Sequence, residues 1–164
     1  MKTKQLFILV FAAMSFIFSS CLKSPADNTS TCVANNTGVP TAAEISSLQN
    51  YITTNNIPAI QHSGGFFYRI ITQGSGATPN LTSNVTVKYT GTLTNGNVFD
   101  QNTTGVTFLL SNLILGWQRG LPLIQKGGTI FLYLPPSLAY GCTQVGSIPA
   151  GSNLIFSIDL VDVQ

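Results

Sequence analysis

The segment VTVKYTGTLTNGNVFD, residues 85–100, decides the fold class of this chain. Apolar or small residues occupy every second position of its first half, which is the period of a strand with one buried face. Asn95-Gly96 follows, and this dipeptide favours the tight turn of a β-hairpin. Val98-Phe99 then begins a further strand. The segment therefore predicts two antiparallel strands joined by a short turn.

Further strand patterns lie on both sides of this hairpin. They are rich in β-branched, aromatic or alternating apolar residues and cover Phe66–Thr72, Thr107–Leu110, Ile130–Leu134 and Leu154–Leu160. Residues 114–124 are the candidate for a short internal helix. A sheet combined with one short helix predicts an α+β domain.

An N-terminal helix is expected ahead of the sheet, over residues 41–57. Thr41 is a good N-cap residue, and Glu44 three positions later completes a capping box. Apolar residues then repeat at helical spacing, at Ile45, Leu48 and Ile52. We expect this apolar face to pack on the core of the domain. The alternative is a contact surface for a second copy of the chain.

The composition indicates an ordered globular chain. Only 7% of the 164 residues are charged and 10% are aromatic, whereas disordered chains are rich in charge and poor in aromatic residues. From Cys21 onward the basic and acidic side chains balance, so the sequence has no basic stripe. Because phosphate neutralisation supplies most of the affinity for nucleic acids, no nucleic-acid partner is expected.

Residues 1–20 have the pattern of a secretory signal peptide. Two lysines precede an apolar run that is shorter than the roughly 20 residues of a membrane span, and two serines stand directly before Cys21. Small residues before a cysteine resemble the lipobox of bacterial lipoproteins, which implies lipidation of Cys21 and a bacterial envelope location. The alternatives are an ordinary cleaved signal and an uncleaved anchor. Residues 21–40 are polar and aperiodic, so they are expected to form a flexible tether.

The remaining cysteines, Cys32 and Cys142, belong to a chain that is expected in an oxidising compartment. A bridge between them would stabilise the fold by about 4 kcal/mol in the chain-entropy model. The alternative is two unpaired thiols. His62 is the single histidine of the sequence, so neither a metal cluster nor a Ser-His-Asp arrangement is expected. We expect no metal and no cofactor.

Four collinear blocks of the sequence resemble the FKBP-type prolyl isomerases. They are VTVKYTGTLTNGNVFD (85–100), FLLSNLILGWQRGL (108–121), GGTIFLYLPPSLAYG (127–141) and IPAGSNLIFSIDLVDV (148–163). The resemblance implies a curved antiparallel β-sheet wrapped around a short α-helix, over residues 64–164. It also implies peptidyl-prolyl cis-trans isomerase activity, without a cofactor.

The resemblance further implies a pocket for the proline ring, with Trp117 as its floor. The residues that match the apolar walls, sides and rim of that pocket are Tyr89, Phe99, Val106, Leu113, Ile114, Ile148 and Phe156. The groups that match its hydrogen-bonding positions are the Ile114 backbone N–H, the Tyr140 hydroxyl and the Asp100 carboxylate. The alternative for the aromatic residues is a place in the core, and the alternative for Asp100 is a turn.

These residue types suit the reaction. Rotation about an X-Pro bond faces a barrier of about 20 kcal/mol because the amide C–N bond has partial double-bond character. No proton is transferred. The enzyme has to bind the twisted amide better than either planar form, and a dry apolar cleft with a few fixed hydrogen bonds provides that preference.

Several positions depart from the family pattern. The segment QNTTGV, residues 101–106, is read as a short loop without the basic residue that many relatives place beside the carboxylate. Val106 stands where some relatives have a larger aromatic residue, and the loop CTQVGS, residues 142–147, is short and has no histidine. Ile-Pro-Ala at residues 148–150 replaces the usual Ile-Pro-Pro. These changes alter the rim and leave the floor and walls in place.

The sequence therefore predicts an envelope-anchored prolyl isomerase that assists the folding of exported proteins. Its expected partners are proline-containing unfolded polypeptides, the membrane through the N-terminal lipid, and macrolide inhibitors that fill the proline pocket. The first alternative is a binding module of the same fold that holds unfolded chains or one partner without turnover. The second is a structural lipoprotein.

Overall fold

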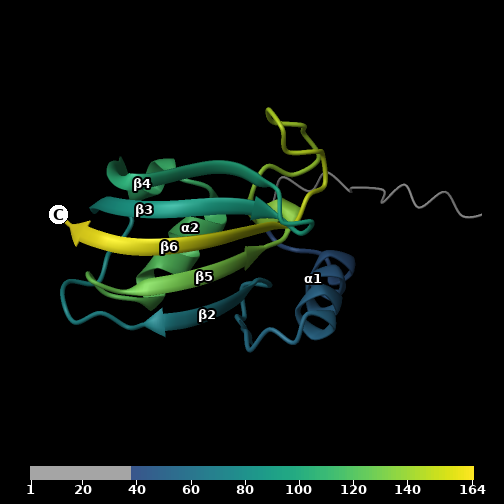
Figure 1. The fold of residues 1–164 in the computed structure, drawn as a ribbon, viewed down its shortest axis with the longest axis horizontal. Helices are drawn as coiled ribbons and strands as arrows, with labels where there is room; N and C mark the ends of the chain where they lie inside the picture. The colour runs from purple at the N-terminus through teal and green to yellow at the C-terminus, as the bar shows by residue number, and fades with distance from the viewer. Residues whose placement is uncertain (1–37) are drawn as a thin grey trace, which may run out of the picture.

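In the computed structural model, which describes residues 38–164, the six strands form one antiparallel sheet of order β1-β2-β5-β6-β3-β4 (Figure 1). The strands are β1 Ile60–Gln61, β2 Phe67–Thr72, β3 Asn84–Leu93, β4 Val98–Leu109, β5 Thr129–Leu134 and β6 Leu154–Val163. The helices are α1 Ala42–Thr54 and α2 Leu115–Gly120, with short 3-10 turns η1 Leu110–Asn112, η2 Leu121–Leu123 and η3 Pro136–Leu138. The α+β fold expected from the sequence is confirmed.

The hairpin predicted from residues 85–100 is β3 and the start of β4. Its turn contains Gly96 at φ +88°, a conformation that suits glycine. The Gly96 N–H donates to the carbonyl of Leu93 at 2.9 Å, and the Leu93 N–H donates to the carbonyl of Asn97 at 2.9 Å. β3 also pairs with β6, so the hairpin supplies an inner strand and an edge strand of the sheet.

The prediction of two separate strands at residues 98–99 and 107–110, joined by a loop, is wrong, because β4 is continuous from Val98 to Leu109. Pairing shifts from Tyr89–Asn102 to Val87–Val106, so β4 carries extra residues opposite β3. The bulge is closed by the Gly105 N–H, which donates to Asn102 Oδ1 at 2.8 Å, and Gly105 adopts φ +113°. A glycine bulge keeps the strand paired where polar residues suggested a loop.

The main hydrophobic core lies between α2 and one face of the sheet, called the inner face here. Trp117 and Leu121 pack there against Leu132, Leu134 and other apolar residues of the strands. Close approach of α2 to β5 requires Gly116, because a Cβ at that position would lie 2.3 Å from Leu134 Cδ1. The small residue thus fixes how deeply α2 and its tryptophan are set into the sheet.

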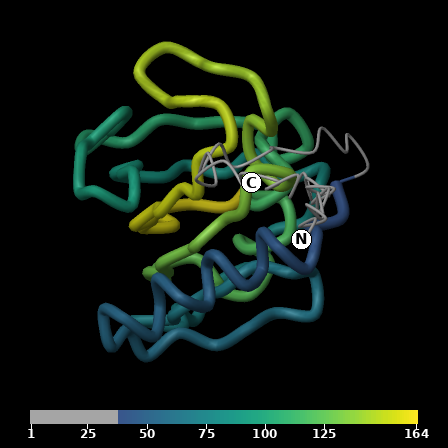
Figure 2. Tube along the Cα trace, turned by 90° about the vertical axis from the view of Figure 1, so that its right-hand side faces the viewer, coloured from purple at the N-terminus to yellow at the C-terminus, as the bar shows by residue number. Residues whose placement is uncertain are grey.

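Helix α1 packs against the opposite, outer face of the sheet. Leu48 and Ile52 are buried in a second apolar cluster with Phe67 and Tyr133. In Figures 1 and 2 this helix lies at the end of the sheet, beside β2 and β5. The capping box is present, since the Glu44 N–H donates to Thr41 Oγ1 at 3.2 Å and the Thr41 N–H donates to Glu44 Oε2 at 2.7 Å. The apolar face expected from the helical spacing is therefore used for packing within the chain.

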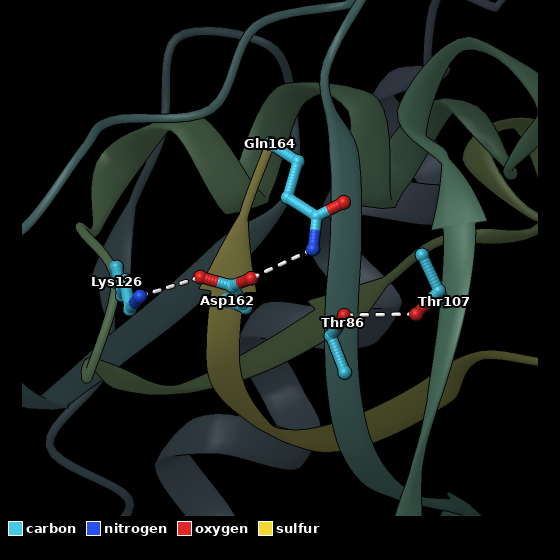
Figure 3. A network of polar contacts seen from close by, with 5 residues as sticks. All are labelled: Thr86, Thr107, Lys126, Asp162 and Gln164. Carbon is cyan, nitrogen blue, oxygen red and sulfur yellow. Dashed lines mark hydrogen bonds and ion pairs between the residues drawn. The ribbon is translucent and has the colours of Figure 1, made fainter.

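A polar network joins the end of β6 to the turn before β5 (Figure 3). Lys126 Nζ lies 2.6 Å from Asp162 Oδ1, and Gln164 Nε2 donates to Asp162 Oδ2 at 2.9 Å. These hydrogen bonds, the one from Lys126 foremost, lower the pKa of Asp162 to about 2. On the neighbouring strands, the hydroxyls of Thr86 and Thr107 are hydrogen-bonded at 2.8 Å.

Several predictions concern residues 1–37, which lie outside the described residues: the signal peptide, lipidation of Cys21 and most of the tether. Cys142 is disulfide-bonded. Its expected partner, Cys32, lies outside the described residues, so that pairing stays a prediction. Within residues 38–164, no helix has the length and apolar character needed to cross a membrane.

Candidate active site

A pocket of about 180 Å³ opens between the start of α2 and the inner face of the sheet. Strands β3, β4 and β6 supply one wall, the segment leading into α2 supplies another, and the turn after η3 supplies a tyrosine at the rim. The lining residues are Tyr89, Asp100, Phe108, Leu113, Ile114, Trp117, Tyr140 and Phe156. Most of this lining is apolar or aromatic.

Trp117 is the centre of an aromatic cluster below the pocket and is only 3% exposed. Its ring meets Tyr89 edge to face at 5.2 Å and Phe156 at 5.3 Å between centroids. Phe99 packs edge-on against Phe156 at 5.5 Å. Edge-to-face pairs at such distances are favourable and hold the rings in place. The pocket therefore has a rigid aromatic floor.

Within the described residues, the Trp117 indole nitrogen is buried and has no hydrogen-bond partner. Buried donors are nearly always paired in folded proteins, so an unpaired one calls for a specific explanation. This one belongs to the side chain that forms the floor of the pocket.

Gly91 explains how the phenylalanine wall is packed. A Cβ at Gly91 would lie 2.5 Å from Phe99 Cζ and 3.0 Å from Phe156 Cε1. Both strands that carry these phenylalanines pair with β3 at Gly91, which stands opposite Asp100 and Phe156. The missing side chain leaves the space into which the two rings fit.

The polar side of the pocket contains two tyrosines and one carboxylate. The Tyr89 hydroxyl donates to Asp100 Oδ2 at 2.6 Å. Burial, followed by this hydrogen bond and the charge of Asp100, raises the pKa of Tyr89 to about 12. Burial, followed by the charge of Asp100, also raises the pKa of Tyr140. Both phenols therefore remain neutral hydroxyl groups at physiological pH, and the hydroxyl of Tyr89 holds the exposed carboxylate in place.

Ile114 is the N-cap residue of α2 and lines the pocket. Its carbonyl accepts hydrogen bonds from the N–H groups of Trp117 and Gln118, at 2.9 and 3.2 Å. Gln118 Nε2 in turn donates to the carbonyl of Leu113 at 2.7 Å, which fixes the segment before the helix. The Ile114 N–H has no acceptor within residues 38–164. It is an N-terminal helix donor beside the pocket.

The structure brings together most of the site residues expected from the sequence. Those that line the pocket are Tyr89, Asp100, Leu113, Ile114, Trp117, Tyr140 and Phe156. Phe99 lies behind Phe156 and supports it. Val106 and Ile148 pack in the main core and are not among the lining residues. Ile148 is only 5% exposed, which leaves little of it for a rim.

The sequence analysis missed Phe108, which lines the pocket in place of Val106. The two residues are two positions apart in β4 and therefore point to the same face of the sheet. Both residues follow the bulge at residues 102–105, and the register that they share with β3 is a property of the paired strands. The signal in the sequence that could have identified Phe108 was the apolar alternation of Val106 and Phe108, which places both on one face of a strand.

This fold and pocket match one family of proteins. A family model described as FKBP-type peptidyl-prolyl cis-trans isomerase covers residues 76–161, more than half of the chain. The chain belongs to the FKBP-type peptidyl-prolyl cis-trans isomerase family.

Two named relatives illustrate the similarity in sequence. FKBP-type peptidyl-prolyl cis-trans isomerase FkpA of Escherichia coli strain K12 is 42% identical over 105 residues, which are 62% of this chain and 39% of that protein. Outer membrane protein MIP of Legionella longbeachae is 44% identical over 105 residues, which are 61% of this chain and 45% of that protein. The chain thus spans less than half the length of these curated relatives.

Solved structures agree with the fold. The crystal structure of FkpA from Escherichia coli gives a TM-score of 0.68 at 36% identity, over 75% of this chain and 60% of that one. A peptidyl-prolyl cis-trans isomerase from Pseudomonas syringae pv. tomato gives 0.66 at 29% identity, over 77% of this chain and 97% of that one.

Proposed function

We propose that this chain is a peptidyl-prolyl cis-trans isomerase that assists the folding of exported proteins. The observation that carries the proposal is the aromatic-floored pocket with neutral hydroxyl donors and one carboxylate on its polar side. Such a pocket suits a reaction that transfers no proton and forms no covalent intermediate. Family membership supports the same activity.

In the proposed mechanism, the proline ring of the substrate rests on Trp117, between Tyr89 and Phe156. The apolar lining excludes water, which strengthens the remaining polar interactions. When the X-Pro bond twists, the amide loses its resonance and its carbonyl group no longer shares charge with the nitrogen. Interactions that favour this twisted form over both planar forms lower the barrier.

Three polar groups provide these interactions in the proposal. The Ile114 N–H and the Tyr140 hydroxyl donate hydrogen bonds to substrate carbonyls and hold the peptide across the pocket. The carboxylate of Asp100 faces the twisted carbonyl, and its orientation is set by the hydroxyl of Tyr89 at 2.6 Å. A fixed carboxylate costs no reorganisation during the reaction, which is the advantage of a preorganised site.

We test the proposal by the relaxation of a short X-Pro peptide from cis to trans, with the full chain in detergent. The uncatalysed reaction takes tens to hundreds of seconds, so acceleration is measurable. We expect Trp117→Ala to remove the acceleration. Asp100→Ala should reduce it at least about tenfold, because it removes the one fixed charge that faces the twisted carbonyl in the proposal. Asp162→Ala is the control, because this carboxylate binds Lys126 and does not line the pocket.

A second function is a binding module that holds unfolded chains or one partner without turnover. The observation in its favour is the exposed position of Asp100, which is followed by a strand segment, residues 101–106, that contains no Lys or Arg. Its carboxylate therefore lacks a neighbouring cation from that segment. A folded chain that binds proline peptides but gives no acceleration would exclude the isomerase and leave the binding module.

We also propose that the chain is anchored in the bacterial envelope through a lipid on Cys21, with macrolides as inhibitors that fill the proline pocket. The signal pattern of residues 1–20 supports the location. One relative is named an outer membrane protein, which agrees with it. Mass spectrometry of the purified chain tests the anchor, since a Cys21→Ser variant should lose the mass of the acyl chains and leave the membrane fraction.

A further inference from the structure

Helix α1 makes a direct contact with the turn that leads to the pocket. Glu44 Oε1 accepts a hydrogen bond from the backbone N–H of Ser137, the middle residue of η3, at 2.9 Å. The other carboxylate oxygen, Oε2, accepts from the N–H and the hydroxyl of Thr41 at 2.7 and 3.0 Å. Since both oxygens are bound, the carboxylate has a fixed orientation between α1 and η3.

The Glu44 contact is linked to Tyr140 by a hydrogen-bonded backbone turn that runs from Pro136 to Gly141. The N–H groups of Ala139 and Gly141 both donate to the carbonyl of Pro136, at 2.9 and 2.8 Å. Gly141 adopts φ +61°, which glycine accommodates without strain. Tyr140 stands between the two donors. Its backbone position therefore depends on the turn whose central N–H is bound by Glu44.

The far side of this turn is also connected to α1. The Gly151 N–H donates to the carbonyl of Gly141 at 3.0 Å. Two residues later, Asn153 Nδ2 donates to Ser47 Oγ in α1 at 3.0 Å. Helix α1 thus binds Ser137, which precedes Tyr140, and Asn153, which follows it. The segment of Asn153 is itself hydrogen-bonded to Gly141, the residue after Tyr140.

The side chain of Tyr140 is only partly covered by its neighbours. It is 37% exposed, although burial of the remainder raises the pKa of its hydroxyl. A hydrogen bond from a backbone N–H to a carboxylate is stronger than one between neutral groups, which makes Glu44 an effective anchor.

We propose that Glu44 is a positioning residue of the active site, which holds the η3 turn so that the Tyr140 hydroxyl is directed at the substrate. Glu44 lies outside residues 76–161, the region that the family model covers. Helix α1 is accordingly part of the catalytic unit. The inference rests on the proposed isomerase function through the role of Tyr140.

The test compares Glu44→Ala and Glu44→Gln in the full chain in detergent. Glu44→Gln is the conservative variant, because its one amide oxygen can still accept the Ser137 N–H, although its NH2 group replaces the oxygen that accepts from the Thr41 N–H. Ile52→Val is the matched control, because it weakens the packing of α1 on the sheet without contact to η3. Three quantities are measured: hydrogen exchange of the Gly141 amide, peptide affinity by fluorescence of the single tryptophan, Trp117, and kcat and KM for an X-Pro peptide.

We expect Glu44→Ala to speed exchange of the Gly141 amide about tenfold or more, because the turn whose Pro136 carbonyl binds this amide loses the hydrogen bond from the Ser137 N–H to a charged group. Peptide affinity should fall severalfold, and Glu44→Gln should restore most of both values. Ile52→Val should leave both unchanged. Equal exchange in Glu44→Ala and the unaltered chain, or an equal effect of Ile52→Val, would overturn the inference. Failure of the unaltered chain to accelerate isomerisation refutes the proposed function instead, because exchange and affinity still test Glu44.

Discussion

Replacing Gly116 by alanine tests how closely α2 has to approach the sheet. The added Cβ would lie 2.3 Å from Leu134 Cδ1 and 2.6 Å from Cδ2, far inside van der Waals contact. Leu134 is fully buried, so its side chain can move aside only by displacing its neighbours in the core. At an exposed helix position the same change would stabilise the protein by about 0.5–1 kcal/mol. Overpacking of a core costs about 1–3 kcal/mol, which outweighs that gain. The expected net loss is about 0–2.5 kcal/mol, with a middle value of about 1 kcal/mol.

The partner substitution Leu134→Ala makes this reasoning specific. Alone, it should cost about 2–5 kcal/mol, because it leaves a cavity beside α2. The methyl group of Gly116→Ala enters part of the space that Leu134 vacates. The double variant should therefore be more stable than the sum of the two effects by about 1 kcal/mol or more, a usual coupling for residues in contact.

Urea unfolding followed by the fluorescence of Trp117 measures all four proteins of this cycle. The isomerase assay completes it, since α2 carries the pocket floor and its displacement should lower the rate. Additive effects of the two substitutions would show that the methyl group and Leu134 do not compete for space. A Gly116→Ala variant more stable than the unaltered chain would refute the close packing of α2 directly.

Four further predictions concern hydrogen bonds. Asp100→Asn should lower the pKa of Tyr89 from about 12 while leaving it above 10, because burial is the larger cause of the shift. Ultraviolet titration measures this pKa. An unchanged pKa would contradict the contribution of the Asp100 carboxylate to the shift. In the unaltered chain, the stability that Tyr89 contributes should be complete below pH 10 and lost as the pH rises towards 12. Lys126→Met should raise the pKa of Asp162 from about 2 towards 3.8, and NMR titration measures it. A pKa that stays near 2 would assign the shift to the other hydrogen-bond donors, Gln164 and the backbone of Val163. Thr41→Ala should cost about 0.5–2 kcal/mol in urea unfolding, and no loss would mean that the cap adds nothing.

Local signals in the sequence predicted the elements of the fold well. Asn95-Gly96 specifies its own turn, and the alternation that precedes it specifies a strand with one buried face. The capping box of Thr41 and Glu44 likewise involves neighbours in the chain and is present in the structure. Each of these features depends on residues that are only a few positions apart in the chain, so each can be identified from the sequence alone.

The errors involved β4. Polar residues at 101–106 suggested a loop, whereas pairing with β3 keeps this segment in the sheet through a bulge at Gly105. The bulge changes the register of β4. Val106 and Phe108 both pack against the main core, and of the two only Phe108 lines the pocket. Register across two strands is a property of their pairing, and neither strand encodes it alone.

The sequence by itself determined the α+β class, the hairpin, the helix that begins after Thr41, and most of the residues that line the pocket, because periodicity, capping and family motifs are written along the chain. Tertiary structure alone decided that Phe108 lines the pocket, that Gly116 sets the depth of α2, and that Glu44 binds the turn before Tyr140. These contacts join residues far apart in sequence. Their geometry depends on strand register and helix packing, which form only when the whole sheet assembles.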